Sequence, residues 1–221
     1  VGCPQPKASA FISSWNSPVH GSSCVHGFID GNDGTVYQTL PWNHRGWHCG
    51  SGSKGSGNNT HIGVEMCEPA CIKYTAGSNF TCSDMATAKA VAKRTYEAAV
   101  ELFAMLCKKY SLDPLTDGVV ISHKEGHSRG IASNHGDPEH LWAQLGMGYT
   151  MDRFRRAFRA AMGGAASGGS STDGYTKIMG SAMATAEQMK NYIKAKNPKV
   201  AQSVLDMVPL YLSEGKAEGV R

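Results

Sequence analysis

The amino-acid sequence predicts an α/β (α+β) domain with a mixed central β-sheet flanked by helices, followed by a short helical C-terminal segment. Three observations support this fold class. Short β-rich runs alternate with stretches of helical periodicity, two of those runs flank a tight turn, and a glycine- and serine-rich segment separates the last helices from the rest. The chain has 221 residues, of which 41% are hydrophobic and 18% charged, a composition typical of folded domains.

A β-hairpin is the first predicted element. The apolar run of residues 24–29 precedes the turn residues Asp-Gly-Asn-Asp-Gly at 30–34, and the β-rich run TVYQTL follows at 35–40. Turn residues between two such runs are a strong hairpin signal. The sequence HIGVEM at 61–66 predicts a buried strand, and GVVIS at 118–122 predicts another.

The longest helix is predicted between these last two strands. Ser83 is placed to cap it, apolar residues recur along it at helical spacing, and it is expected to end near Tyr110. Two shorter helices are expected to follow, one beginning at Pro138 and one over residues 151–162. This alternation of strands and helices is what favours a mixed sheet.

The segment GGAASGGSSTD divides the chain. It lacks large apolar residues and is rich in glycine, serine and alanine, which is typical of a flexible linker. We therefore expect a main domain over residues 1–162, a linker over 163–174 and the start of a second module over 175–221. Helices are predicted in that module near 176–195 and 198–213.

Charge and hydropathy disfavour two classes of partner. The formal net charge is +4, and no block of lysine and arginine interleaved with aromatic residues predicts a nucleic-acid-binding face. No apolar run is long enough to cross a membrane, and no signal peptide is visible. Because the chain opens on Val1 rather than methionine, we expect a fragment trimmed at both ends, so the absence of a signal says little about secretion.

The seven cysteines do not settle the redox compartment. They form no paired Cys-x-x-Cys motifs, so a structural zinc ribbon is not expected. Cys67, Cys71 and Cys82 cluster around one loop, where one disulfide could form in an oxidising compartment. Cys107 is expected to be a small buried residue of the long helix.

The segment ISHKEGHSRGIASNHGDP at 121–138 reads as a strand end followed by a loop that concentrates imidazole and carboxylate side chains: His123, His127, His135 and Asp137. Neutral imidazole and carboxylate are usual zinc ligands, and a catalytic zinc site uses three ligands and leaves one position for water. Pro138 suits the first position of a helix, so Asp137 is placed to cap that helix. The alternative is a polar loop with solvated histidines and an ordinary cap.

Glu65 is the candidate proton acceptor. It lies among Ile62, Val64 and Met66 in a predicted strand, where a carboxylate is costly unless paired. Partial desolvation raises the pKa of such a group toward the range useful in proton transfer. A metal-bound water flanked by a carboxylate and an imidazole is what metal-assisted amide hydrolysis needs. The alternative places Glu65 on an exposed edge or in an ion pair with lysine or arginine.

Four motifs occur in order along the main domain. They are the hairpin CVHGFIDGNDGTVYQTLP, WNHRGWHCG at 42–50, HIGVEM, and SHKEG followed by SNHGDPEHLW. Together they resemble the zinc-dependent N-acetylmuramoyl-L-alanine amidases of the amidase-2 family, which share their fold with phage endolysins, bacterial autolysins and peptidoglycan recognition proteins. The resemblance spans nearly all of residues 1–162. It implies cleavage of the peptidoglycan amide between N-acetylmuramic acid and L-alanine.

The resemblance also implies roles for single residues. His123 and Asp137 fall where the family has two zinc ligands, and Glu65 falls where it has the catalytic acid. His135 replaces a lysine that stabilises the tetrahedral intermediate in many members, and histidine is not a fixed cation. Val25 stands where some relatives use a tyrosine, which favours a mechanism based on Glu65.

The third zinc ligand of the family is a histidine at the end of the first strand. We expect this ligand upstream of Val1, and His26 or His48 is the alternative within the chain. Trp42, Trp47 and His48 are expected to line the substrate groove, because aromatic and polar edges suit sugar and peptide contacts. Core packing is the alternative for the two tryptophans.

The second module resembles the start of a bacterial glucosaminidase of the flagellar-protein type. The resemblance rests on MATAEQMKNYIKAKNP and EGKAEGVR. In that family the catalytic carboxylate follows such a segment, which would place it beyond Arg221. A helical linker or a wall-binding module is the alternative.

The sequence therefore predicts a zinc-dependent peptidoglycan hydrolase. We expect a monomer that acts at the bacterial cell wall, secreted or released at phage lysis, with no nucleic-acid partner and no stable membrane association. The competing function is a non-catalytic peptidoglycan-binding protein of the same fold, against which the retained His123, Asp137 and Glu65 argue. A more distant alternative reads NHRGWHCG and the later histidines as a nuclease site, and the strand context of HIGVEM disfavours it.

Overall fold

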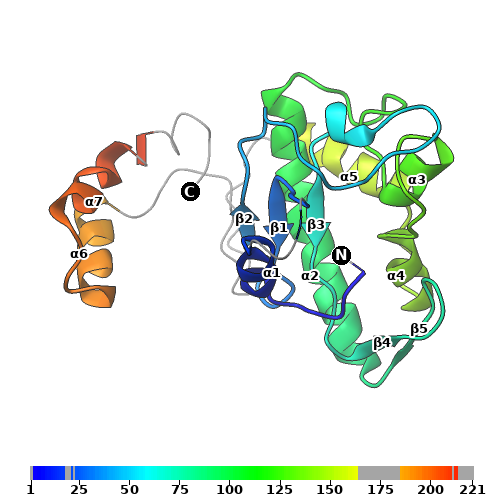
Figure 1. Cartoon of the computed structure of the whole chain (residues 1–221), viewed down its shortest axis with the longest axis horizontal. Helices are drawn as coiled ribbons and strands as arrows, with labels where there is room; N and C mark the ends of the chain where they lie inside the picture. The colour runs from blue at the N-terminus through cyan, green and yellow to red at the C-terminus, as the bar shows by residue number, and fades with distance from the viewer. Residues whose placement is uncertain (1, 18–20, 22, 164–184, 211, 214–221) are drawn as a thin grey trace. The chain divides into compact units, whose positions relative to one another are not determined.

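The computed structural model of the chain describes residues 2–17, 21, 23–163, 185–210 and 212–213. The chain divides into two units, Val1–Gly164 and Ala165–Arg221. Figure 1 shows the described elements, which in chain order are α1 (Ala8–Trp15), β1 (Gly27–Ile29), β2 (Val36–Gln38), the 3-10 helix η1 (Gly57–Asn59), β3 (Val64–Met66), β4 (Ile72–Tyr74), β5 (Phe80–Cys82), α2 (Met85–Lys109), α3 (His123–Ser128), α4 (Glu139–Gln144), α5 (Met151–Gly163), α6 (Ala186–Lys196) and α7 (Gln202–Asp206).

The central sheet has three strands in the order β2-β1-β3. Strand β1 pairs antiparallel with β2 and parallel with β3, so the predicted mixed sheet is confirmed. The predicted hairpin is confirmed as well. Its turn is closed by hydrogen bonds from Asp30 N to Thr35 O and from Gly34 N to Asp30 O, both 2.9 Å. Gly34 has a φ of 79°, which a side chain would strain, so glycine is needed at this position.

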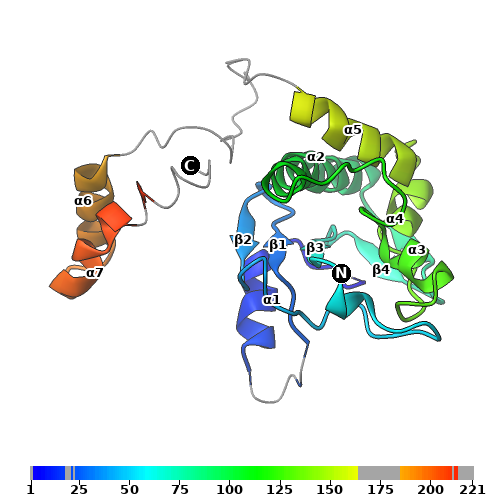
Figure 2. The ribbon, with the colours of Figure 1, turned by 90° about the horizontal axis from the view of Figure 1, so that it is seen from above.

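Helices cover both faces of this sheet. On one face, α1 packs Ala8 and Phe11 against Val25 and Phe28. On the other face, Ile29 packs into the main core with α2, and α5 packs against α2. Phe28 and Ile29 are consecutive in β1 and therefore point to opposite faces. Figure 2 shows the resulting order of layers: α1, sheet, α2 and α5.

Helix α1 is absent from the sequence-based expectations. Its first amide is satisfied from a distant part of the chain, because Ala8 N donates to the carboxylate of Asp30 at 2.8 Å. The same carboxylate accepts from Asn32 N at 2.7 Å in the hairpin turn. Asp30 is buried, so one carboxylate ties α1 to the hairpin. The residues beside Ala8 carry no cap of their own that would have indicated the helix.

Helix α2 confirms the longest predicted helix, although its cap differs. Asp84 rather than Ser83 caps it, since Asp84 Oδ1 accepts from Thr87 N at 3.0 Å. The Ser83 hydroxyl instead donates to Cys71 O at 3.1 Å. The helix ends at Lys109, one residue before the predicted end.

The strand predicted over residues 118–122 is wrong. The carbonyl of Gly118 accepts from His61 Nε2 at 2.9 Å, and the carbonyl of Val120 accepts from Arg155 Nη1 at 3.0 Å. Side chains thus bind this backbone where a strand would have a neighbouring strand. Val120 is nevertheless buried in the main core, so the apolar run indicated burial rather than strand pairing.

The segment of residues 121–138 contains an unpredicted helix, α3. A capping box starts it: Ser122 Oγ accepts from Glu125 N at 3.0 Å, and Glu125 Oε2 accepts from Ser122 N at 3.1 Å. The helix predicted at Pro138 is α4, which begins at Glu139 after a cis Asp137–Pro138 bond. No side chain caps α4, so the prediction that Asp137 caps it is wrong; its carboxylate lines the groove described below.

The segment between Cys67 and Cys82, expected to be a loop, contains the two-stranded sheet β4–β5. All seven cysteines are free thiols. Cys71 and Cys82 are in hydrogen-bond contact at the base of this hairpin, whereas Cys67 is buried in the core beneath α1. Cys107 is buried in α2, as predicted.

In the second unit the structure describes two helices. The predicted helix near 176–195 is confirmed from Ala186 onward, where a capping box of Thr185 and Gln188 starts α6. Its earlier part, residues 176–184, and residues 164–174 of the predicted linker lie outside the described residues. Helix α7 covers part of the last predicted helix. In the described part of the chain, no helix has the length and apolar character to span a membrane.

Candidate active site

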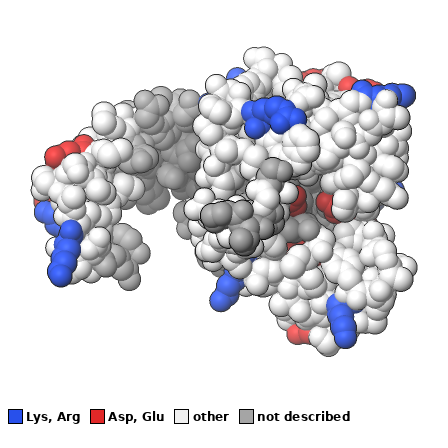
Figure 3. All heavy atoms as spheres, viewed as in Figure 1, with Lys and Arg blue, Asp and Glu red and all other residues white. Residues whose placement is uncertain are grey.

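A groove on the first unit brings together most of the residues that the sequence indicated. The groove encloses about 200 Å³, and among the residues that line it are Glu65, His123, His135, Asp137, Trp47 and His48. Glu65 comes from β3, His123 is the first residue of α3, and His135 and Asp137 lie in the segment before α4. Figure 3 shows a hollow in the surface of this unit with acidic side chains inside it.

A larger, mainly apolar cavity of about 460 Å³ adjoins this groove. Glu65, His123 and Asp137 line both spaces. The larger cavity extends among aromatic and aliphatic side chains such as Phe103 of α2 and Trp142 of α4. Strand β3 is an edge strand of the described sheet, and its residues form part of the wall. The polar groups therefore lie between a polar groove and an apolar interior.

His123 is half-buried and held by a serine. Its Nε2 lies 3.1 Å from Ser133 Oγ, which donates to Cys49 O at 3.2 Å. The ring of His135 lies beside it, with the centroids 4.5 Å apart. Burial lowers the pKa of His123, and His135 lowers it further, while the Asp137 carboxylate acts in the opposite direction. The neutral imidazole, which is the metal-binding form, is thereby favoured.

Glu65 lies at the boundary of the two spaces. Burial raises the pKa of its carboxyl group, and the nearby carboxylates of Asp137 and Glu68 raise it further. A raised pKa brings a carboxylate closer to the range useful for exchanging protons near neutral pH. Glu65 therefore has the environment of a proton acceptor, and it lines the groove rather than an exposed edge of the sheet.

The donor set fits part of a zinc site. The charges of Asp137 and His123 interact, and together they offer one carboxylate and one imidazole, both usual zinc ligands. Across the residues that the structure describes, no group of three histidine, cysteine, aspartate or glutamate side chains is placed to hold a metal. His26 is not available as a third ligand: its Nδ1 accepts from Gly63 N at 3.0 Å, and its Nε2 lies 2.8 Å from His44 O.

His48 forms a fixed, neutral part of the groove wall. Burial lowers its pKa to about 4, and its Nε2 lies 3.1 Å from His61 O. The ring lies directly against Gly63, where a Cβ atom would come within 2.2 Å of it. Gly63 therefore makes room for His48 beside β3.

The two predicted tryptophans lie in different surroundings. Trp47 is 41% exposed and lines the groove, with the Arg45 guanidinium 4.9 Å from the centre of its ring. Trp42 lines the apolar cavity, packs against the main core and stacks on His26 with ring centroids 6.4 Å apart. The surroundings of Trp42 match the alternative of core packing, and those of Trp47 match a substrate contact.

A buried network next to this site was not anticipated. The Tyr74 hydroxyl donates to Glu68 Oε2 at 2.9 Å and lies 2.7 Å from His140 Nε2. Glu68 is 2% exposed, and burial raises the pKa of Tyr74, with the Glu68 carboxylate raising it further. The network joins β4 to α4. Neither it nor Ser133 had a sequence signal, whereas the Ser-x-x-Glu pattern of the α3 capping box was readable.

Comparisons with known proteins identify the family of the chain. A family model described as N-acetylmuramoyl-L-alanine amidase matches residues 4–140. Three similar proteins of Bacillus subtilis (strain 168) carry that name. CwlH is 49% identical over 39 residues, which cover 18% of this chain and 16% of CwlH. XlyA is 54% identical over 39 residues, covering 18% of this chain and 13% of XlyA.

The third, CwlA, is 30% identical over 90 residues, covering 34% of this chain and 32% of CwlA. The matched part of the chain thus spans 32% or less of each of these relatives. No solved structure matches the chain. Since the family model covers more than half of the sequence and includes Glu65, His123 and Asp137, the chain belongs to the N-acetylmuramoyl-L-alanine amidase family.

Proposed function

We propose that the first unit hydrolyses the amide between N-acetylmuramic acid and L-alanine of peptidoglycan, with zinc held by His123 and Asp137. The chain belongs to the N-acetylmuramoyl-L-alanine amidase family, and the proposal extends this to its activity, its metal and the bond that is cut. It rests on one observation above all: Glu65, His123, His135 and Asp137 converge on one groove from three segments of the chain.

Each residue of the groove is assigned a different role in amide hydrolysis. Zinc, when bound, supplies Lewis acidity for the scissile carbonyl and lowers the pKa of water. Glu65 takes a proton from the attacking water and returns it to the leaving amine of L-alanine. His135 lies beside His123 and donates a hydrogen bond to the oxygen that gains negative charge. Trp47, at the exposed rim, stacks on sugar or peptide, and His48 shapes the adjacent wall.

A third ligand is proposed to come from residues that precede Val1 in the full-length protein. His26 has both ring nitrogens bonded to the backbone, and the Nε2 of His48 faces a backbone carbonyl. Strand β3 is an edge strand of the described sheet, and the apolar cavity of about 460 Å³ has Glu65 in its wall. This arrangement supports a ligand entering from outside residues 1–221.

The alternative function is peptidoglycan binding without catalysis. One observation favours it: among the described residues, no three candidate ligands come together. The two functions differ in product, because a binding protein would retain peptidoglycan and leave its amide bonds intact. We favour the enzyme because Glu65 lies beside His123 and Asp137, where a binding protein has no need of a proton acceptor.

We further propose that the protein is a monomer acting on the glycan strand and stem peptide of the bacterial cell wall. Secretion, or release at phage lysis, would bring it there, and neither nucleic acid nor a stable membrane contact is involved. The second unit is proposed to begin a glucosaminidase-like module, on the sequence resemblance alone.

Digestion of purified peptidoglycan tests the function. A chain extended upstream of Val1, so that it includes the proposed third ligand, is incubated with zinc, and new L-alanine amino termini and new reducing sugar ends are both counted. The proposal expects new amino termini, no new reducing ends, and loss of product when a chelator removes the metal. Retention of peptidoglycan with no product would support the binding protein. New reducing ends alone would show a glycosidase and contradict the amidase assignment.

A further inference from the structure

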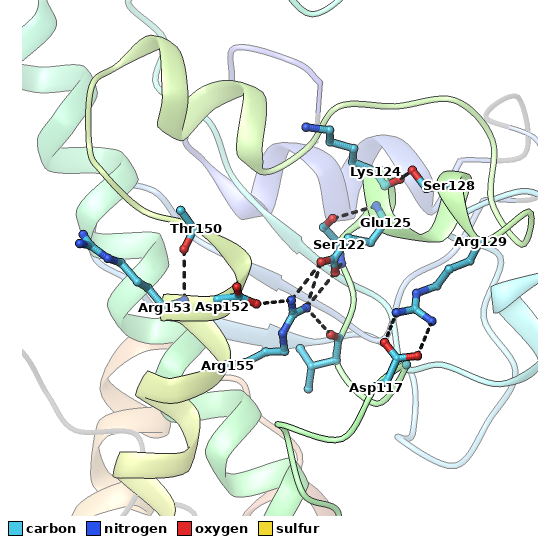
Figure 4. Close-up of polar contacts among 12 residues, drawn as sticks. Asp117, Ser122, Lys124, Glu125, Ser128, Arg129, Thr150, Asp152, Arg153 and Arg155 are labelled. Carbon is cyan, nitrogen blue, oxygen red and sulfur yellow. Dashed lines mark hydrogen bonds and ion pairs between the residues drawn. The ribbon is translucent and has the colours of Figure 1, made fainter.

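The guanidinium of Arg155 joins α5 to the backbone that carries His123. Its Nη1 donates to Val120 O at 3.0 Å and to Glu125 Oε2 at 2.9 Å, and its Nη2 donates to Glu125 Oε1 at 3.1 Å. Nη2 also donates to Asp152 Oδ1, one turn earlier in α5, at 2.9 Å. Figure 4 shows these contacts radiating from one side chain.

The two partners outside α5 lie on either side of His123. Val120 is three residues before it, and Glu125 is two residues after it, in the first turn of α3. Glu125 also accepts from Ser122 N, and Ser122 Oγ accepts from Glu125 N. One guanidinium therefore connects the backbone at Val120 to Glu125 in the first turn of α3, and His123 lies between these two residues in the sequence.

In the segment of residues 118–122, side chains bind backbone carbonyls that a neighbouring strand would bind in a sheet. The carbonyls of Gly118 and Val120 are bound by His61 and Arg155, and no strand among the described residues pairs with it. A backbone in a sheet is fixed by a ladder of hydrogen bonds, and here the Arg155 side chain binds the carbonyl of Val120, three residues before His123. The planar guanidinium makes two-point contact with the Glu125 carboxylate, which lysine cannot reproduce.

Helix α5 has an anchor that does not involve Arg155. Phe154 and Phe158 are 3% and 0% exposed and pack in the main core with α2. The Arg155 side chain is 17% exposed and that of Glu125 is 26% exposed, so the ion pair is partly shielded from solvent. The packing of α5 therefore does not depend on the guanidinium, whereas Val120 and Glu125 are both bonded to it.

We propose that Arg155 is a positioning residue of the zinc site, acting through Val120 and Glu125 to fix the direction of the His123 imidazole. This inference rests on the proposed function, since it takes His123 as a zinc ligand. Partners that orient a ligand are worth about 10- to 100-fold in metal affinity. Such partners usually bind the ring of a histidine ligand. Arg155 would instead act through the backbone on either side of His123.

The same helix offers a matched control. At the other end of α3, Arg129 forms an ion pair with Asp117, whose side chain is 85% exposed. This pair joins the C-terminal cap of α3 to Asp117, which precedes the segment that Arg155 binds. It touches no group beside His123. Exposed ion pairs of this kind contribute little.

Zinc affinity of a chain extended upstream of Val1, so that it includes the proposed third ligand, tests the proposal. Wild type, Arg155→Met, Arg155→Lys, Glu125→Gln, Arg129→Met and His123→Ala are titrated with zinc chloride by calorimetry, at a temperature where circular dichroism shows each to be folded. Arg155→Met is expected to weaken zinc binding about tenfold, and Arg155→Lys to recover part of the loss. Glu125→Gln, which keeps an acceptor for Ser122 N, should weaken binding to a smaller extent, and Arg129→Met should stay within about twofold of wild type.

The outcomes separate this inference from the function on which it rests. Equal zinc binding by wild type and His123→Ala would contradict the zinc site itself. A loss in His123→Ala with wild-type affinity in Arg155→Met would overturn the role of Arg155 alone. Should Arg155→Met not fold, Arg155→Lys and Glu125→Gln decide: wild-type affinity in both would overturn the proposal, and weakened binding in both would support it.

Discussion

The imidazole rings of His123 and His135 lie with their centroids 4.5 Å apart and an angle of 47° between their planes. The hydroxyl of Ser133 lies 3.1 Å from a ring nitrogen of each, so one side chain orients both rings. His135 thus sits beside the proposed ligand, within reach of a group bound there. It occupies a position suited to stabilising charge, while His123 and Asp137 are the proposed ligands.

Replacement of His135 should affect turnover rather than metal binding. His135→Ala is expected to lower kcat about 100-fold, because one donor to the developing oxyanion is lost, with zinc affinity nearly unchanged. His135→Lys, which restores a donor, should retain much of the activity. Steady-state kinetics on a soluble muropeptide and a zinc titration check both. If His135→Ala lost zinc as completely as His123→Ala, His135 would be a ligand instead.

Glu65→Gln should keep the metal and lose the reaction. The amide fits the same space but cannot accept a proton, so kcat is expected to fall between about 100- and 10,000-fold. Glu97→Gln is the matched control, because Glu97 is a half-exposed residue of α2 in an ion pair with Lys93. Near-wild-type kcat in Glu65→Gln would remove it as the proton acceptor, whatever the zinc content.

Tyr74→Phe should destabilise the first unit. The buried Glu68 carboxylate would lose a donor, and a buried polar group left short of a partner costs about 1–3 kcal/mol. Urea unfolding gives this difference, with Tyr37→Phe as the control because Tyr37 is 38% exposed in β2. Equal losses in the two variants would mean that the Glu68–Tyr74–His140 network contributes nothing specific.

The position of the third ligand gives a separate prediction. Residues 1–221 alone should bind zinc weakly, because the described residues bring together no set of three ligands. On the proposal that the third ligand precedes Val1, a chain extended upstream of Val1 should bind zinc more tightly. Zinc titration of the two chains makes the comparison. Tight, one-to-one binding by residues 1–221 alone would show that the third ligand lies within them.

Local sequence signals predicted the elements that depend on local chemistry. The turn residues after Ile29 determined the hairpin, and helical periodicity indicated α2. Helix α1 could not be predicted because its first amide is bound by Asp30, 22 residues away. The apolar residues 118–122 were read as a strand, yet their backbone is bound by the distant side chains of His61 and Arg155.

The residues of the candidate site have local sequence signals, whereas the side chains that support them have none. Glu65, His123, His135 and Asp137 were indicated by residue type and motif order, and the structure brings them to one groove. Their supports were not indicated, because Ser133, Arg155 and Tyr74 act through contacts that no sequence spacing reveals. The exception is the Ser122–Glu125 capping box, because the four-residue pattern Ser-x-x-Glu is typical of a helix start and occurs at the start of α3.

The most direct measurement is the affinity for zinc of His123→Ala and Asp137→Ala, beside wild type and His127→Ala, all in a chain extended upstream of Val1. His127 is an exposed histidine near the end of α3 and serves as the control. The account predicts that wild type and His127→Ala bind zinc alike, and that His123→Ala and Asp137→Ala each lose that binding together with release of L-alanine amino termini from peptidoglycan. Wild-type zinc affinity in either His123→Ala or Asp137→Ala would contradict it.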